Sequence, residues 1–510
     1  MSRRASQMGR RLLQIQRVLV ATLIASPLAA QDPASTIVIA SKSFTEAVIL
    51  GEIAVGVVRN AGYVADHRRE LGGTRVLFNA LMSGDIDVYG EYTGTIIQEI
   101  LAELDLQTED ELRAALRERG ILMTKPLGFN NSYAIGMRPE TAARLGVSTI
   151  SDLRGHPELR IGMSNEFMDR GDGWPSLRRA YGLAGDNARG LDHDLAYRAL
   201  DGGDIDVMDV YTTDAEISYY GLRLLEDDLS FFRTYDAVYL YRADLETRAP
   251  GVAAALRRLE DTMSEASISL MNAQVKLDGE AETAVAGVFL REALSITGVV
   301  REVSFGGRLW LRTKEHLFLV SISMTLGIIV AIPLGIVAFR NPRLGQGILG
   351  AVGMIQTVPA LALLVFMIPV LGIYAPPAIA ALFLYSLLPM VRNTHTGLVS
   401  IPPSIEESAE ALDLSSWARL LQVELPLASP SIMAGVKTAV VINIGFATLG
   451  ALIGAGGYGQ PILTGIRLDD TSLILEGAVP AALLALLVQY LFGLIERVVV
   501  PKGLRLKRAA

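Results

Sequence analysis

Residues able to carry covalent or metal chemistry are few in this sequence. The chain of 510 residues contains no cysteine, and none of its five histidines stands at the spacing of a zinc ligand pair. No nucleophile is accompanied by a base and an orienting group, and the phosphate-binding pattern G-x-x-x-x-G-K-[ST] is absent. We therefore predict no catalytic residue, no metal site and no cofactor on this chain. The chemistry left to it is non-covalent binding.

The best candidate for binding is a phrase that occurs twice. Gly84-Asp-Ile-Asp-Val-Tyr-Gly-Glu-Tyr-Thr93 and Gly203-Asp-Ile-Asp-Val-Met-Asp-Val-Tyr-Thr212 align without a gap. Each copy is typical of a buried strand followed by a turn that carries Tyr-Thr. Since ligands of open α/β sheets bind beyond the carboxyl ends of strands, two facing lobes would direct Tyr92 and Tyr211 into a shared cleft. Chance similarity of two Asp-Ile-Asp phrases is the alternative.

The elements that would position these tyrosines alternate along residues 32–300. Helical stretches such as 47–60 and 252–263 stand between strand-like runs, which predicts an α/β fold. The strand-like runs cover 37–40, 86–89, 133–137, 160–163 and 205–210. Overall the chain is 51% hydrophobic and 20% charged, with the charge concentrated in this region and long apolar runs from Leu317 onward. A net charge of −8 argues against a nucleic-acid partner.

The N-terminus has the pattern of an export signal. A basic segment precedes an apolar stretch over 18–30, which is short for a membrane span and fits the hydrophobic region of a signal peptide. We expect residues 1–30 to be a cleaved signal peptide or, if cleavage fails, a signal anchor. Either outcome places the following domain outside the cytoplasm.

The C-terminal half predicts five membrane spans, over 316–339, 347–372, 376–391, 430–453 and 474–499. With the preceding domain outside, these five spans bring the clustered basic residues to the cytoplasm, as the positive-inside rule requires. An even number of spans would break this rule. Those residues are Arg340, Arg343, Arg392, Lys502, Arg505, Lys507 and Arg508. In the outer loop after the fourth span, Arg467 is balanced by Asp469 and Asp470. The predicted location is the inner membrane.

A polar cytoplasmic loop, 405–426, separates the third and fourth spans. Acidic residues such as Glu406 begin one helix, Asp413 and Ser415 break and cap the chain, and Pro426 is expected to end a second helix. This loop resembles the EAA loop of ABC-importer permeases. The matching positions are Glu407, Ala409, Val423, Leu425 and Pro426, and Asp413 replaces the usual glycine. Asp tolerates left-handed turn geometry, so the turn is expected to survive.

The resemblance implies the partners. In that family the loop inserts into a separate ATPase subunit, which would hold ATP and Mg²⁺. Five spans do not easily enclose a pathway, so we expect a permease homodimer. The predicted permease domain covers 315–510, and 301–314 is its connector to the binding domain.

The region 36–300 resembles the substrate-binding proteins of glycine betaine/choline importers, the osmoprotectant class. The markers are Ser41-Lys-Ser-Phe-Thr-Glu46, Leu71-Gly-Gly-Thr74, Glu91-Tyr-Thr-Gly-Thr95, Phe129-Asn-Asn-Ser-Tyr133, Asp169-Arg170 and Tyr211-Thr-Thr-Asp214. The resemblance implies a two-lobed periplasmic binding protein of type II, with a second lobe over about 137–234. It further implies a cation cage of Tyr92, Tyr133, Tyr211 and Tyr235, and a carboxylate clamp of Lys42, Thr95 and Arg170.

The chemistry of these residues fits a quaternary ammonium, which offers no classical hydrogen-bond donor and is recognised by aromatic faces. We favour glycine betaine over choline, since choline would leave Lys42 and Arg170 without a counter-charge. Carnitine is a further alternative. Arg170 has an alternative role as an ion-pair partner of Asp169 or Asp172, and Lys42 as a solvated strand end. Tyr235 is the weakest cage assignment, because Tyr239 and Tyr241 stand close by.

These features together predict the fused receptor and permease of an ABC importer that takes up an osmolyte. A membrane-tethered osmolyte sensor is a less favoured reading, because it would need no EAA loop.

Overall fold

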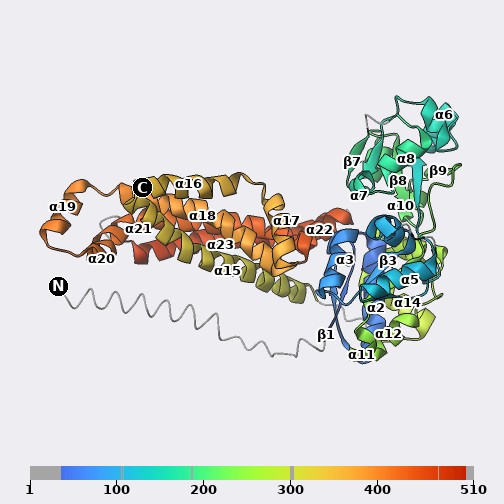
Figure 1. The fold of residues 1–510 in the computed structure, drawn as a ribbon, viewed down its shortest axis with the longest axis horizontal. Coiled ribbons are helices and arrows are strands. Elements are labelled where there is room, and N and C mark those ends of the chain that lie inside the picture. Colours follow the sequence, from blue (N-terminus) through green and yellow to red (C-terminus); the bar gives the residue numbers. More distant parts are fainter. Residues whose placement is uncertain are drawn as a thin grey trace.

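The structure of the chain, a computed structural model, describes residues 36–104, 106, 108–184, 188–298, 304–468 and 470–500. The predicted signal at 1–30, Asp469, and the basic cluster from Lys502 to Arg508 lie outside these ranges. Figure 1 shows an α/β half at one end of an elongated helical half.

The first lobe of the α/β half contains a five-stranded sheet in the order β2-β1-β3-β10-β4. Strand β1 is parallel to β2 and β3, whereas β10, which returns from the second lobe, is antiparallel to β3 and β4. The strands are β1 (Thr36–Ala40), β2 (Val64–Arg68), β3 (Val88–Tyr92), β4 (Ile121–Met123) and β10 (Ala237–Arg242). The helices are α2 (Thr45–Asn60), α3 (Thr74–Ser83), α4 (Thr93–Thr95), η1 (Ile96–Ile100), η2 (Ala102–Leu104), α5 (Glu109–Glu118), α11 (Leu245–Arg248), α12 (Pro250–Arg257), α13 (Glu265–Lys276) and α14 (Glu282–Leu294).

The second lobe is built on a three-stranded sheet in the order β8-β5-β9, with a parallel pair β6-β7 beside it. It includes all of β5 (Tyr133–Met137), so its sheet starts before the predicted boundary at about 137. The other strands are β6 (Gly162–Ser164), β7 (Arg189–Leu191), β8 (Val207–Tyr211) and β9 (Arg223–Leu225). The helices are α6 (Pro139–Leu145), η3 (Ser151–Gly155), α7 (Asn165–Asp169), α8 (Trp174–Tyr181), α9 (His193–Asp201) and α10 (Ala215–Tyr219).

Both copies of the repeated phrase form the predicted buried strand, β3 in the first lobe and β8 in the second. Each phrase begins with a glycine at positive φ, +83° at Gly84 and +77° at Gly203, a conformation that other residues rarely adopt. The last residue of each strand is the tyrosine of the repeat, Tyr92 or Tyr211. The repeat therefore delivers two equivalent tyrosines, one from each lobe.

Over its described residues, the helical half has four helices that are long and apolar enough to cross a membrane, and a fifth span if the bent pair α16–α17 counts as one. The two members of that pair meet at an angle of 98°, at the Val358-Pro359 break. The helices are α15 (Phe305–Arg340), α16 (Pro342–Thr357), α17 (Ala360–Leu371), α18 (Ala375–Val399), α21 (Leu425–Phe446), η5 (Ala447–Ile453), α22 (Gly459–Arg467) and α23 (Thr471–Val499). Helix α15 begins inside the predicted connector 301–314, so the chain is already helical there from Phe305.

The polar loop forms α19 (Pro403–Ala411), α20 (Ser416–Arg419) and η4 (Leu420–Glu424). The expectation that Pro426 ends the second helix is wrong, because one helical path runs from Ser416 to Ile453. Proline lacks an N–H and its ring clashes with the carbonyl of the preceding turn. The wider π-turn of η4 directly before Pro426 relieves this clash. Figure 1 places α19 and α20 at the end of the bundle opposite to the α/β half.

Candidate functional site

The tyrosines of the repeat face each other where the two lobes meet. The ring of Phe44 lies between them, with its centroid 6.3 Å from that of Tyr92 and 5.5 Å from that of Tyr211. Phe44 is the residue directly before α2, so the loop after β1 places it at the carboxyl end of the first-lobe sheet. Tyr92 and Tyr211 therefore converge on the boundary between the two lobes, on either side of Phe44.

Tyr133 lies at the centre of the aromatic cluster. Its ring centroid is 5.2 Å from that of Tyr211 and 5.8 Å from that of Tyr235. It also lies near Phe167 and Phe232, at 4.9 and 6.2 Å. The structure thus brings all four predicted tyrosines together, and we call them, with Phe44, Phe167 and Phe232, the aromatic cage.

The three phenylalanines of the cage were not predicted. Phe44 had a signal, because it stands in the Ser-Lys-Ser-Phe-Thr-Glu phrase two residues after Lys42. Phe167 and Phe232 stand in segments without any pattern, and only the fold brings them to Tyr133.

The predicted carboxylate-binding cations lie beside the cage, and each already has an acidic partner. The Lys42 ammonium is 5.5 Å from the centroid of the Tyr92 ring and pairs with Glu91 at 2.5 Å. The Arg170 guanidinium is 5.3 Å from the centroid of the Tyr133 ring and donates two hydrogen bonds to Asp172, of 2.7 and 2.6 Å. The alternative ion-pair role for Arg170 is therefore realised with Asp172.

Lys42 is buried, which excludes the alternative of a solvated strand end. Thr95, the third predicted member of the clamp, is also buried, in the turn directly after β3. Lys42 and Thr95 follow the ends of β1 and β3 in the first lobe, and Arg170 follows α7 in the second lobe.

A buried carboxylate, Glu46, connects the two lobes behind the cage. It accepts hydrogen bonds from the Tyr92 hydroxyl at 2.5 Å, the Asn131 amide at 2.9 Å, the Thr213 hydroxyl at 2.5 Å and the Asn272 amide at 3.2 Å. The side chain is buried, with 2% of its surface exposed. Burial raises the pKa of Glu46, and the four hydrogen bonds offset this only in part. Sequence reasoning included Glu46 in a marker phrase but gave it no role.

A second cage tyrosine, Tyr235, also donates a hydrogen bond to a buried carboxylate. The Tyr235 hydroxyl donates to Asp172 at 2.7 Å, the same carboxylate that holds Arg170. Hydrogen bonds from Tyr92 and Tyr235 to carboxylates fix the orientation of both rings and direct negative charge towards the cage. Tyr235, the cage residue that the sequence marked most weakly, thus lies beside Tyr133 with its hydroxyl held by Asp172.

The second lobe adds an imidazole to the cage wall. The His193 ring stacks on Tyr211, with centroids 4.2 Å apart and planes inclined by 23°, and its Nε2 pairs with Asp214 at 2.9 Å. Burial alone would lower the pKa of His193, but Asp214 and then Asp209 raise it to about 9. His193 is therefore a cation at neutral pH.

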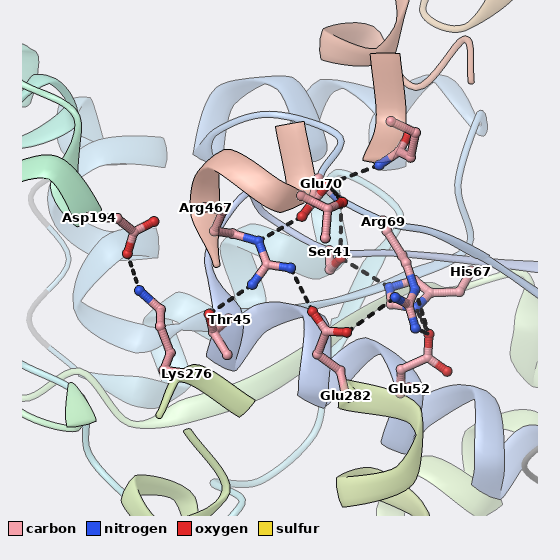
Figure 2. Close-up of polar contacts among 12 residues, drawn as sticks. Ser41, Thr45, Glu52, His67, Arg69, Glu70, Asp194, Lys276, Glu282 and Arg467 are labelled. Carbon is pink, nitrogen blue, oxygen red and sulfur yellow. Dashed lines mark hydrogen bonds and ion pairs between the residues drawn. The ribbon is translucent and has the colours of Figure 1, made fainter. Parts of the chain in front are cut away.

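The first lobe is joined to the helical half by a buried cluster around Arg467 of α22 (Figure 2). Its guanidinium pairs with Glu70 at 2.6 Å and with Glu282 at 2.6 Å, and donates to the Thr45 hydroxyl at 2.8 Å. Gln460 donates to the second oxygen of Glu70 at 2.9 Å. Arg467 is only 7% exposed, so these charges are held away from water and depend on one another.

A second contact lies at the turn between α17 and α18. The Tyr374 ring faces the Arg68 guanidinium at 5.1 Å, and its hydroxyl donates to the Asp85 carbonyl at 3.3 Å. Across the ranges described, the polar contacts between the two halves involve residues of the first lobe. We call this surface the docking surface. Thr45 belongs to it, and the next residue is Glu46 behind the cage.

The polar loop at the other end is held as one unit. Asp413 has φ +54°, the left-handed geometry expected where the resembled family has glycine. Arg419 pairs with Glu410 of α19 at 2.5 Å and with Glu424 at 3.2 Å, and Glu424 pairs with Arg340 at the end of α15 at 2.6 Å.

The predicted coupling residues differ in exposure. Ala409 is buried, Val423, Leu425 and Pro426 are partly buried, and Glu407 and Asp413 are exposed. Trp417 and Leu412 are also exposed, by 67% and 74%, which is unusual for large apolar side chains on a polar loop.

Comparisons with known proteins agree with this division. A family model described as the substrate binding domain of the ABC-type glycine betaine transport system matches residues 35–292. A second, the binding-protein-dependent transport system inner membrane component, matches residues 323–503.

Individual relatives match one half each. The glycine betaine/carnitine/choline transport system permease protein OpuCB of Bacillus subtilis is 44% identical over 200 residues, which are 39% of this chain and 92% of that protein. The osmoprotectant import permease protein OsmW of Salmonella typhimurium is 43% identical over 198 residues, 38% of this chain and 92% of its own. A crystal structure of a glycine betaine/carnitine/choline ABC transporter has a TM-score of 0.43 and 27% identity, and covers 50% of this chain and 98% of that chain.

Proposed function

The chain belongs to the osmoprotectant importers of ABC type, as a glycine-betaine-class substrate-binding domain fused to an inner-membrane permease domain, and from this premise we propose that it captures a quaternary-ammonium osmolyte outside the membrane and carries it inward. Residues 36–298 are called the receptor below and residues 304–500 the permease. The chain is a multi-pass inner-membrane protein and, by its family, a transporter subunit and not an enzyme.

The aromatic cage is the observation that carries the proposal. Tyr92, Tyr133, Tyr211 and Tyr235 converge from both lobes, and two of their hydroxyls donate to buried carboxylates. A trimethylammonium group needs such a site, because each ring face attracts a cation by roughly 0.5–2 kcal/mol without any donor on the ligand. The rings touch across the lobe boundary, so a ligand held between them would hold the lobes closed.

The identity of the rest of the ligand depends on the two cations. Glycine betaine is preferred in the sequence analysis because choline would leave Lys42 and Arg170 without a counter-charge. The pairs of these cations with Glu91 and Asp172 remove that reason. A betaine carboxylate would have to share Lys42 or Arg170 with the acid that already pairs with it, through the N–H donors that this acid does not use. We therefore propose the quaternary ammonium group, shared by glycine betaine, choline and carnitine, as what the cage recognises.

The two ends of the permease support a direction of transport. The receptor contacts one end and the coupling loop 405–426 lies at the other (Figure 1). We propose that the receptor is extracytoplasmic and that the loop meets a separate ATPase, which binds ATP and Mg²⁺. The exposed Trp417 and Leu412 supply the apolar surface for that contact.

A second copy of the chain is expected to complete the pathway. The permease has an open cavity of about 530 Å³ at the break between α16 and α17, lined by Gln356, Pro359, Tyr385 and Phe446 among others. Broken helices are tolerated at membrane depth where they are covered by protein or line a polar path. A homodimer would place two such cavities against each other.

Ligand titration into the purified full chain tests the proposal. We expect heat of binding from glycine betaine, choline or carnitine, and none from proline, which has no trimethylammonium group. Uptake by membranes that contain the chain and its ATPase should require ATP. Absence of binding for all three quaternary ammonium compounds would refute the cage assignment.

A further inference from the structure

The cavity at the break between α16 and α17 is formed by three spans of the permease. Its volume is about 530 Å³, and its lining comes from the break itself, from Tyr385 of α18 and from residues of α21 up to Phe446. These are helices that cross the membrane, and no Asp, Glu, Lys, Arg or His residue lines the cavity. A ligand in this cavity must therefore be held by neutral groups.

Two aromatic rings contribute to the wall of this cavity. The ring centroids of Tyr385 and Phe446 lie 5.0 Å apart, with planes inclined by 81°. The Tyr385 hydroxyl donates to the Val358 carbonyl, which ties its ring to the helix break. Phe446 is 36% exposed, whereas Tyr385 is buried, so the Phe446 ring is the more open of the two. An aromatic face attracts a cation without needing a donor on the ligand.

The C-terminal end of α16 adds partial negative charge at the same cavity. The last carbonyls of a helix have no partner inside the helix and form the negative end of its dipole. The Met354 carbonyl accepts from the Thr357 hydroxyl at 2.7 Å, and the Ile355 carbonyl from the Val358 amide at 3.2 Å. The carbonyls of Gln356 and Thr357, two residues of the cavity wall, receive no hydrogen bond from the described residues.

We propose that this cavity binds the trimethylammonium group of the transported ligand, as a second and weaker site within the permease. This inference rests on the proposed function. Ring faces and free carbonyl oxygens are both suited to a cation that offers no classical hydrogen-bond donor.

The second site is expected to be weaker than the aromatic cage because it lacks full negative charges. In the cage, the hydroxyls of Tyr92 and Tyr235 donate to carboxylates, whereas the Tyr385 hydroxyl donates to a backbone carbonyl. A site on a path through the membrane has to release its ligand again, so a weak site suits transit.

Thiol labelling tests the second site, because the chain has no cysteine of its own. Thr357→Cys and Gln356→Cys each place one thiol on the cavity wall, and Ala254→Cys, exposed on α12 of the receptor, is the matched control. The reagent is 2-(trimethylammonium)ethyl methanethiosulfonate, which itself carries the proposed group, applied to membranes that contain the full chain. We expect excess tetramethylammonium chloride, compared with equal sodium chloride, to slow modification of both cavity thiols at least about threefold. Modification of the control thiol should not change.

Two further substitutions separate the second site from the cage. In Thr357→Cys, adding Phe446→Leu should abolish the protection and Phe446→Tyr should keep it, while titration shows unchanged ligand affinity of the full chain. Adding Tyr133→Leu should do the reverse, weakening the titrated affinity and keeping the protection. A folding defect, or a rearrangement driven by the receptor, would not give this crossed pattern.

The outcomes distinguish this inference from the proposed function. Cavity thiols that tetramethylammonium does not protect, or that the reagent does not reach, overturn the second site while the proposed function stands. Protection that survives Phe446→Leu or disappears with Tyr133→Leu overturns it as well. Binding of no quaternary ammonium compound by the wild-type chain overturns both.

Discussion

At the scale of single residues, Tyr133 is the member of the cage with the most ring neighbours, namely Phe167, Tyr211, Phe232 and Tyr235. We expect Tyr133→Leu to weaken binding of a quaternary ammonium about 3- to 30-fold, since one ring face contributes roughly 0.5–2 kcal/mol. Tyr133→Phe should bind nearly as well, because the ring face is kept. Titration of the full chain measures both.

Tyr219→Leu serves as the control for this pair. Tyr219 is a second-lobe tyrosine that is 64% exposed on α10, so its loss should leave the affinity unchanged. If Tyr133→Phe were as damaging as Tyr133→Leu, the hydroxyl and not the ring face would be the binding group.

His193 makes receptor stability depend on pH. Its folded pKa, about 9, lies above the ordinary value of 6.5, so its pair with Asp214 stabilises the fold fully below about pH 6.5 and loses that contribution as the pH rises through 9. The shift corresponds to about 3 kcal/mol at most. At pH 6 we expect the wild type to have a higher melting temperature than His193→Gln. This difference should shrink by pH 10. A difference in melting temperature that is constant over this range would contradict the ion pair.

Residues of the site differ in how far the sequence could reveal them. Tyr92 and Tyr211 were predictable because a repeat fixed both their type and their strand end. Glu46 was not, because its role depends on four donors that are up to 226 positions away along the chain. The pair of Lys42 with Glu91 was equally hidden, whereas Asp172 was one of two partners predicted for Arg170. Ion pairs depend on side-chain direction, which spacing alone does not set.

At the scale of elements, the turn between α19 and α20 depends on one backbone conformation. Asp413 has φ +54°, where asparagine, aspartate and glycine are tolerated and β-branched residues are strongly disfavoured. We expect Asp413→Gly to keep ATP-driven uptake and Asp413→Val to lower it at least about fivefold, because a displaced loop no longer fits the ATPase. Uptake of labelled ligand into vesicles with the partner ATPase measures this.

Ligand binding to the receptor separates this effect from misfolding. Both Asp413 variants should bind ligand with wild-type affinity, since the loop lies at the far end of the permease (Figure 1). Equal uptake by the glycine and valine variants would show that the left-handed turn is not needed for coupling.

Elements were predicted well where apolar runs were long, and less well where prolines interrupt them. The third predicted span begins within one residue of α18, but the helix continues to Val399 because its last turns pack inside the bundle. The second span is instead two helices at 98°, since Pro359 cannot continue α16. At Pro426, by contrast, the helix continues through the proline. A proline within the first turn of α21 is tolerated there, after a π-turn that hydropathy does not reveal.

At the scale of the whole molecule, the receptor is attached to its permease through the first lobe. The contacts of Arg467 and Tyr374 reach residues of that lobe, while the second lobe projects away from the bundle (Figure 1). We therefore expect the second lobe to open and close while the receptor stays docked. A tethered receptor also meets its permease at roughly millimolar effective concentration. Capture and delivery then need no release of the receptor.

Arg467 tests this attachment. In Arg467→Gln, Glu70 loses its buried ion-pair partner and Glu282 keeps only Arg69, at 3.3 Å. Removing one partner of a buried ion pair typically costs about 3–5 kcal/mol. We expect uptake at saturating ligand to fall at least about tenfold, while the ligand affinity of the full chain changes less than about threefold, because the cage residues are unchanged. Arg308→Gln is the control, since Arg308 pairs with Glu476 within the permease, partly exposed, and such pairs contribute little. Exchanging the charges, in Glu70→Arg with Arg467→Glu, should restore part of the uptake if attraction between the two halves is what matters. Wild-type uptake by Arg467→Gln would mean that the Tyr374 contact and the tether hold the receptor in place without the buried cluster.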